Sequence, residues 1–128
     1  MIQSPYQKYQ QLSAQTATPI QLVIMLYDGA IRFTKLGIEG ISSRDFEKAN
    51  QFLCKAEAIM HELVASLNFD YPISKQLVNL YEYMLHQLIQ ANVKKEASFA
   101  QEVVQHLTEL RDSWKLAAGS NTQREVAQ

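Results

Sequence analysis

Apolar residues repeat at intervals of three and four along four separate stretches of this chain, and this spacing constrains the fold more than any other feature. In an α-helix such positions lie on one face. The stretches cover residues 19–39, 46–67, 73–91 and 98–117. No stretch shows the sustained alternation of apolar and polar residues that is typical of a half-buried strand. We therefore predict an all-α fold without strands.

Glycine and proline residues lie where they punctuate these stretches. Residues 18–21, Thr-Pro-Ile-Gln, form a capping box with proline at the first helical position. Pro72 separates the second stretch from the third. Gly40 and Gly119 follow the first and fourth stretches, and we expect each to end its helix. Gly29 lies inside the first stretch, where we expect it to permit close helix packing.

Short links between four long helices favour an antiparallel four-helix bundle, because consecutive helices then pack side by side in opposite directions. We expect residues 18–119 to form this bundle as one domain. Residues 1–17 would form a short N-terminal cap segment, helical or irregular, and residues 120–128 a flexible polar tail.

Composition and charge argue against several classes of protein. The formal net charge is −1, with 12 Lys and Arg against 13 Asp and Glu, so a polybasic nucleic-acid binder is not expected. The longest apolar run, residues 22–27, is far shorter than the roughly 18 residues that suggest a membrane span. No secretory signal is recognisable at the N-terminus. We expect a cytosolic protein without membrane insertion.

Candidate catalytic and metal-binding residues do not form a known arrangement. His61-Glu62 begins like a zinc-protease helix, but Ala65 occupies the position of the second histidine. His86 and His106 have no ligand spacing around them. The single cysteine, Cys54, lies in an apolar stretch, and we expect it to pack in the interior and not to act as a nucleophile. We expect no enzyme activity, no metal and no cofactor.

A second apolar series widens the apolar face of the first three helices. Its members, mostly seven or four residues apart, are Ile24, Ile31, Ile38, Phe52, Ile59, Val78, Leu85 and Ile89. Each helix of a bundle contacts two neighbours, and this alone can explain a wide face. A hydrophobic groove that receives a partner helix or an extended amphipathic segment explains it equally well. Both explanations remain open at the level of the sequence.

The polar segment before the first helix carries apolar residues at a spacing of three. Tyr6, Tyr9 and Leu12 would lie along one face of a short helix. In the absence of a partner, this segment would rest on the apolar surface of the bundle.

Three blocks of sequence together form a specific pattern. The first is PYQKYQQLSAQTATPIQLVIMLYDGAIRF, residues 5–33, with two tyrosines, a Thr-Ala-Thr-Pro motif and a Met-Leu-Tyr-Asp-Gly helix. The others are YEYMLHQLIQANVK, residues 81–94, and LRDSWKLA, residues 110–117. In order and spacing these blocks resemble the FliS family of flagellar export chaperones for flagellin. Ile20 and Gln21 depart from the glycine and glutamate common in the family after this proline.

This resemblance implies a four-helix bundle that binds the disordered C-terminal segment of flagellin, prevents premature polymerisation and assists export. Components of the export apparatus are further candidate partners. The resemblance places Tyr9 at the family's second tyrosine, with Tyr6 beside it. Together with Leu12 and with members of the second apolar series, the candidate binding residues are Tyr6, Tyr9, Leu12, Ile24, Ile31, Phe52, Ile59, Val78, Leu85 and Ile89. The alternative function is a non-catalytic helical adaptor that binds another amphipathic helix in the same groove.

Overall fold

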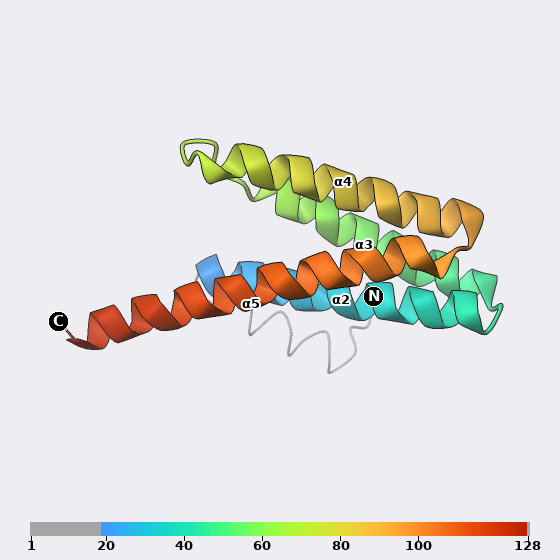
Figure 1. Ribbon diagram of the computed structural model, residues 1–128, viewed down its shortest axis with the longest axis horizontal. Coiled ribbons are helices and arrows are strands. Elements are labelled where there is room, and N and C mark those ends of the chain that lie inside the picture. Colours follow the sequence, from blue (N-terminus) through green and yellow to red (C-terminus); the bar gives the residue numbers. More distant parts are fainter. Residues whose placement is uncertain (1–18, 128) are drawn as a thin grey trace, which may run out of the picture.

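Four α-helices make up the part of the chain that the structure describes. The computed structural model describes residues 19–127, with side chains placed through residue 119. The helices are α2 (Pro19–Ser42), α3 (Phe46–Ala65), α4 (Ile73–Lys94) and α5 (Ala97–Ala127), and residues 19–127 contain no strand (Figure 1). The predicted all-α fold is confirmed.

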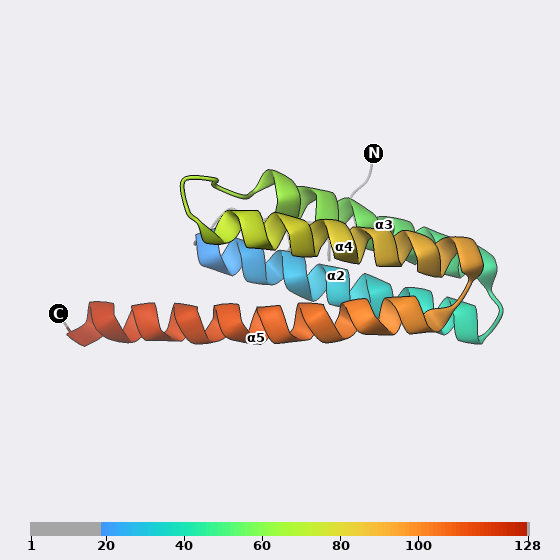
Figure 2. The same cartoon turned by 45° about the horizontal axis from the view of Figure 1, so that its top comes forward.

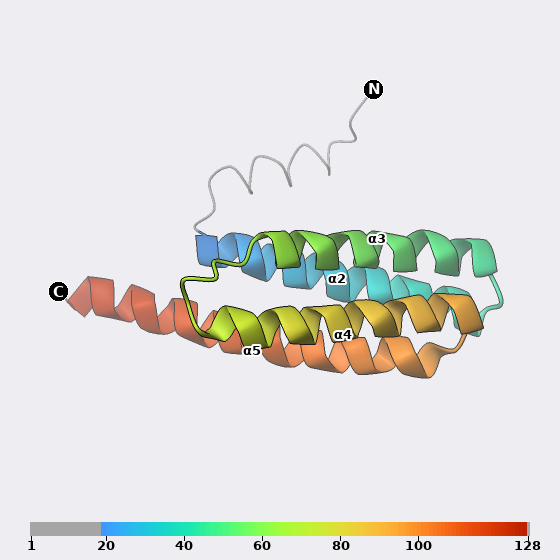
Figure 3. The ribbon, with the colours of Figure 1, turned by 90° about the horizontal axis from the view of Figure 1, so that it is seen from above.

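The helices form a ring in which each contacts the next along the chain, and α5 closes the ring against α2. Consecutive helices run in opposite directions, as Figure 3 shows most clearly. Both features follow from the short links, which leave no room for a long crossover. α5 is longer than its neighbours, with 31 residues, and its C-terminal part runs past the end of the bundle (Figure 2). The predicted four-helix bundle is confirmed.

The core lies along the stripes that the spacing of three and four predicts. Its fully buried large side chains come from all four helices: Tyr27, Leu53, Met60, Leu63, Tyr81, Met84, Leu88, Val103 and Leu107. Thr34 is polar but also fully buried, and its hydroxyl donates a 2.7 Å hydrogen bond to the Ala30 carbonyl. A bond of this kind satisfies a buried hydroxyl inside a helix without a partner from another element.

Gly40 does not end α2, and the prediction that it does is wrong. The helix continues to Ser42, and Gly40 is buried inside it. A Cβ atom at Gly40 would lie 2.6 Å from the backbone nitrogen of Ala49, so α2 and α3 approach here too closely for a side chain. The chain reverses at Arg44, whose φ is 59°, and the Asp45 side chain then caps α3 by accepting a bond from the Lys48 N–H.

The prediction that Gly119 ends the last helix is also wrong, because α5 continues to Ala127. A glycine costs a helix about 1 kcal/mol relative to alanine, which weakens the helix but does not stop it. The residues expected as a tail, 120–127, therefore continue α5.

At Gly29 the expectation is confirmed: a Cβ there would lie 3.1 Å from the Ile59 Cδ1 atom, so the glycine lets α2 and α3 pack closely.

Candidate partner-binding surface

The residues expected to bind a partner fall into two groups. Tyr6, Tyr9 and Leu12 lie outside the described residues. The other seven lie on α2, α3 and α4. Each lines a seam, which is the surface where two neighbouring helices meet.

The members on α2 lie towards α5. Ile24 is half-buried, and Ile31 belongs to the core with 5% of its surface exposed. They share the side of α2 that carries Tyr27 and Asp28, by the 100° step of the helix. Asp28 accepts a 3.1 Å bond from the Arg111 guanidinium of α5, which locates this side of α2 at the α2/α5 seam.

The members on α3 lie in the α2/α3 seam. Phe52 stacks on Phe33 of α2, with ring centroids 6.0 Å apart and an interplanar angle of 22°. Ile59 reaches Gly29 of α2, where the glycine leaves room for its side chain. Both residues are half-buried, so part of each side chain remains accessible.

The members on α4 lie in the α3/α4 seam. Val78 and Leu85 are half-buried, and Ile89 has 40% of its surface exposed. They share the side of α4 that carries Asn92, by the 100° helical step. The Asn92 amide donates a 2.8 Å bond to the Asn50 side-chain oxygen of α3, which locates that side.

The structure therefore brings the seven residues together in pairs or triplets at three seams and does not gather them in one straight groove. A rigid helix would cover one seam only. A chain that crosses from seam to seam would cover all three, with each cluster receiving a different apolar side chain. The arrangement fits a segment that folds as it wraps the bundle.

Cys54 lies on the surface at the α3/α4 seam, so the expectation that it packs in the interior is wrong. Its thiol donates to the Asn50 side-chain oxygen at 3.6 Å, and the Asn92 amide lies 3.9 Å from its sulfur. Partial desolvation, followed by the charge of Glu57, raises the pKa of the thiol. A raised pKa disfavours the nucleophilic thiolate.

A polar cluster connects α4 and α5 on the other side of α4. The Glu102 carboxylate accepts bonds from the Tyr83 hydroxyl at 2.6 Å and the Gln87 amide at 2.8 Å, and His106 lies 3.5 Å away. The bond from Tyr83, and then that from Gln87, lowers the pKa of Glu102. Within residues 19–119 no group of three or more His, Cys, Asp or Glu side chains could hold a metal ion.

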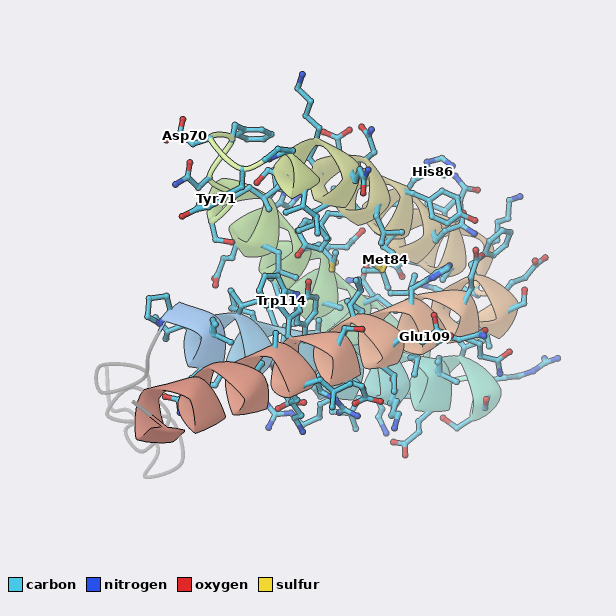
Figure 4. The ribbon with its side chains drawn as sticks, turned by 60° about the vertical axis from the view of Figure 1, so that its left-hand side comes forward. Asp70, Tyr71, Met84, His86, Glu109 and Trp114 are labelled. Atoms are coloured by element: carbon cyan, nitrogen blue, oxygen red, sulfur yellow. The ribbon has the colours of Figure 1, made fainter. Side chains whose placement is uncertain are left out.

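Sequence reasoning missed the exposed apolar side chains of the α3–α4 link. Phe69, Tyr71 and Ile73 are 58%, 63% and 55% exposed. The loop is held by its own bonds, since the Asn68 side-chain oxygen accepts from the Asp70 N–H at 2.9 Å. Figure 4 shows Asp70 and Tyr71 at the end of the bundle, away from the interior residue Met84. The aromatic residues at positions 69 and 71, so close to Pro72, are the signal in the sequence for this exposed group.

None of the helices in residues 19–127 is both long enough and apolar enough to cross a membrane.

Comparisons with known proteins agree on one family. The family described as Flagellar protein FliS matches residues 1–121. The Flagellar secretion chaperone FliS of Bacillus subtilis is 41% identical over 119 residues, which cover 93% of this chain and 90% of the relative. The protein of that name from Salmonella typhimurium is 32% identical over 114 residues, 84% of each chain.

A solved structure, described as the crystal structure of a flagellar chaperone from bacteria, has a similar fold. The TM-score is 0.76 at 24% sequence identity, and the similarity covers 91% of this chain and 99% of the other. At this level of identity the likeness supports the fold alone.

Proposed function

This chain belongs to the FliS family of flagellar secretion chaperones, and from that premise we propose that it binds the C-terminal segment of flagellin in the cytosol before export. The family is one of chaperones, so the function is binding and not catalysis. A secretion chaperone acts on its partner before the partner leaves the cell, which supports the cytosolic location. The family match does not favour the alternative of an adaptor for an unrelated helix.

The observation that carries this proposal is the distribution of partly exposed apolar side chains over three seams. Phe52 and Ile59 line the α2/α3 seam, and Val78, Leu85 and Ile89 line the α3/α4 seam. A disordered amphipathic segment can wrap such a surface and bury apolar area as it folds. Binding in this way keeps the segment from assembling with other flagellin subunits.

The N-terminal segment belongs to the same proposal. Tyr6, Tyr9 and Leu12 precede α2 by fewer than 14 positions, so the chain allows them to reach the surface near the start of that helix. We expect them to cover apolar surface in the free protein and to affect flagellin binding, with Tyr9 as the main contact.

Calorimetric titration of the full chain with a flagellin C-terminal peptide tests the proposal. Ile89→Asp places a charge on the α3/α4 seam, and we expect it to weaken binding by about tenfold or more, as loss of a central apolar contact does. Tyr9→Ala should also weaken binding. Leu116→Asp is the matched control, because Leu116 is 74% exposed on α5, away from the α3/α4 seam. A folded protein that gives no heat of binding with this peptide would contradict the proposal.

A further inference from the structure

A pair of stacked aromatic rings with two cations beside them stands out in the α2/α3 seam. The Arg32 guanidinium carbon lies 4.9 Å from the centroid of the Phe33 ring. The Lys55 ammonium lies 5.5 Å from the Phe33 centroid and 5.3 Å from that of Phe52. These four residues, Arg32, Phe33, Phe52 and Lys55, are called the aromatic–cation cluster below.

Phe52 contributes little to the interior of the bundle. Phe33 packs against the buried core, whereas Phe52 is not among the described side chains that do so. Phe52 is half-buried, with the Phe33 ring stacked on it and the Lys55 ammonium over its face. A large apolar side chain held at the surface in this way leaves part of its own area for a further contact.

The charge of Lys55 is not matched by a carboxylate. Within residues 19–119, no Asp or Glu oxygen lies within 4.0 Å of its ammonium nitrogen, and its partners are the two ring faces. Lys48, two turns earlier on α3, differs in this respect because its ammonium lies 3.3 Å from the Glu39 carboxylate. Lys55 thus places a positive charge without a carboxylate partner beside the apolar area of the two rings.

We infer that the aromatic–cation cluster is the point at which bound flagellin places an apolar side chain next to a carboxylate. The apolar side chain covers the exposed part of the Phe33–Phe52 stack, and the carboxylate pairs with Lys55. Covering the rings also removes water from around the ion pair, which strengthens the attraction. This inference rests on the proposed function and specifies the chemistry that one seam selects.

The geometry of the rings disfavours a nucleic acid as the occupant. Bases bind to single-stranded-nucleic-acid proteins by stacking on open aromatic faces. Here Phe33 and Phe52 stack on each other, and Arg32 and Lys55 lie over them. Both phenylalanines are half-buried, so part of each side chain remains accessible to an apolar partner.

The test is calorimetric titration of the full chain with the flagellin C-terminal peptide at 50 and 500 mM NaCl. Lys55→Gln should weaken binding by about two- to fivefold at low salt, the range for exposed ion pairs. The difference from wild type should shrink at high salt because salt screens the pair. Lys75→Gln removes an exposed lysine on α4, away from the seam, and should leave the affinity unchanged.

A double-mutant cycle identifies the carboxylate. Replacing each acidic residue of the peptide by its amide should produce one peptide that loses affinity for wild type but not for Lys55→Gln. Circular dichroism of each variant checks that the fold is retained. Equal affinities of wild type and Lys55→Gln at both salt concentrations would overturn the inference and leave the proposed function intact. No binding by the wild type would overturn both.

Discussion

The indole Nε1 of Trp114 donates a 3.0 Å hydrogen bond to the hydroxyl of Tyr27, a residue 87 positions earlier in the chain. The same hydroxyl shares a hydrogen bond with the hydroxyl of Tyr81. The three residues come from α5, α2 and α4, so one buried oxygen connects α2 to the helix beside it and to the helix across the bundle. Polar contacts of this kind define how helices with interchangeable apolar faces are arranged.

Tyr27→Phe should destabilise the protein more than Tyr81→Phe does. Removing the Tyr27 hydroxyl leaves two groups without their partner, the Tyr81 hydroxyl and the Trp114 indole, and we expect a loss of about 2–3 kcal/mol. Tyr81→Phe should cost about 1 kcal/mol, because Tyr27 keeps its bond from Trp114. Urea unfolding followed by circular dichroism measures both. Tyr71→Phe is the control, since Tyr71 is 63% exposed and should stay within about 0.5 kcal/mol of wild type. Equal losses at Tyr27 and Tyr81 would contradict this account.

Two glycines should respond to alanine in opposite directions. At Gly40 the new Cβ would meet the Ala49 backbone at 2.6 and 2.9 Å, and backbone cannot move aside as a side chain can. Overpacking of about 1–3 kcal/mol, less about 1 kcal/mol of helix propensity, leaves Gly40→Ala destabilised by up to about 2 kcal/mol. At Gly119 nothing lies within 4 Å, so Gly119→Ala should gain up to about 1 kcal/mol. The melting temperature checks both signs, and a rise for Gly40→Ala would contradict the close approach.

The same glycines show what the sequence could predict and what it could not. Spacing of three and four identifies the buried face of a helix, which is why Leu53, Met60 and Leu88 lie in the core as the pattern predicts. The role of Gly40 depends on the distance between α2 and α3 at this point, and local sequence rules do not predict that distance. A glycine that follows a periodic stretch predicts the end of a helix, but Gly40 lies inside α2 and permits its close contact with α3.

The candidate surface was harder to predict for a related reason. Cys54 lies one position beyond the buried Leu53, and a 100° step takes it from the core to the surface. The regular spacing of the second apolar series suggests one common surface. Its members face different neighbours because the order of helices around the bundle decides which seam each one lines. That order follows from tertiary contacts, such as the bond between Asn50 and Asn92.

The buried tyrosines predict a loss of stability at alkaline pH. Burial raises the pKa of both Tyr27 and Tyr81 above the usual value of about 10. The folded state therefore holds these protons more tightly than the unfolded state does. The contribution is fully present below pH 10 and is lost as the pH rises above it. Absorbance at 295 nm should show these two phenols ionising only together with the loss of helical circular dichroism.

Variants identify the two phenols in that titration. Tyr27→Phe and Tyr81→Phe should each remove part of the absorbance change that accompanies unfolding. Complete ionisation of all tyrosines while the helices remain intact would contradict the buried arrangement.

The alkylation rate of the exposed Cys54 thiol reports whether a bound partner covers the α3/α4 seam. Its sulfur lies 3.9 Å from the Asn92 amide, on the side of α4 that also carries Leu85 and Ile89. Alkylation by iodoacetamide should proceed in the folded protein and quicken as the pH approaches the raised pKa of the thiol. If flagellin crosses this seam, the rate should fall in proportion to the fraction of protein bound to its C-terminal peptide.

The matched control places the only thiol elsewhere. A chain carrying Cys54→Ser and Leu116→Cys has its cysteine on α5 at a position that is 74% exposed, away from the α3/α4 seam. Its alkylation rate should stay the same with and without the peptide. An unchanged rate at Cys54, under conditions where calorimetry shows saturation, would mean that the bound segment leaves the α3/α4 seam open. The path of flagellin would then be restricted to the seams on either side of α2, because those are the remaining seams that carry members of the second apolar series.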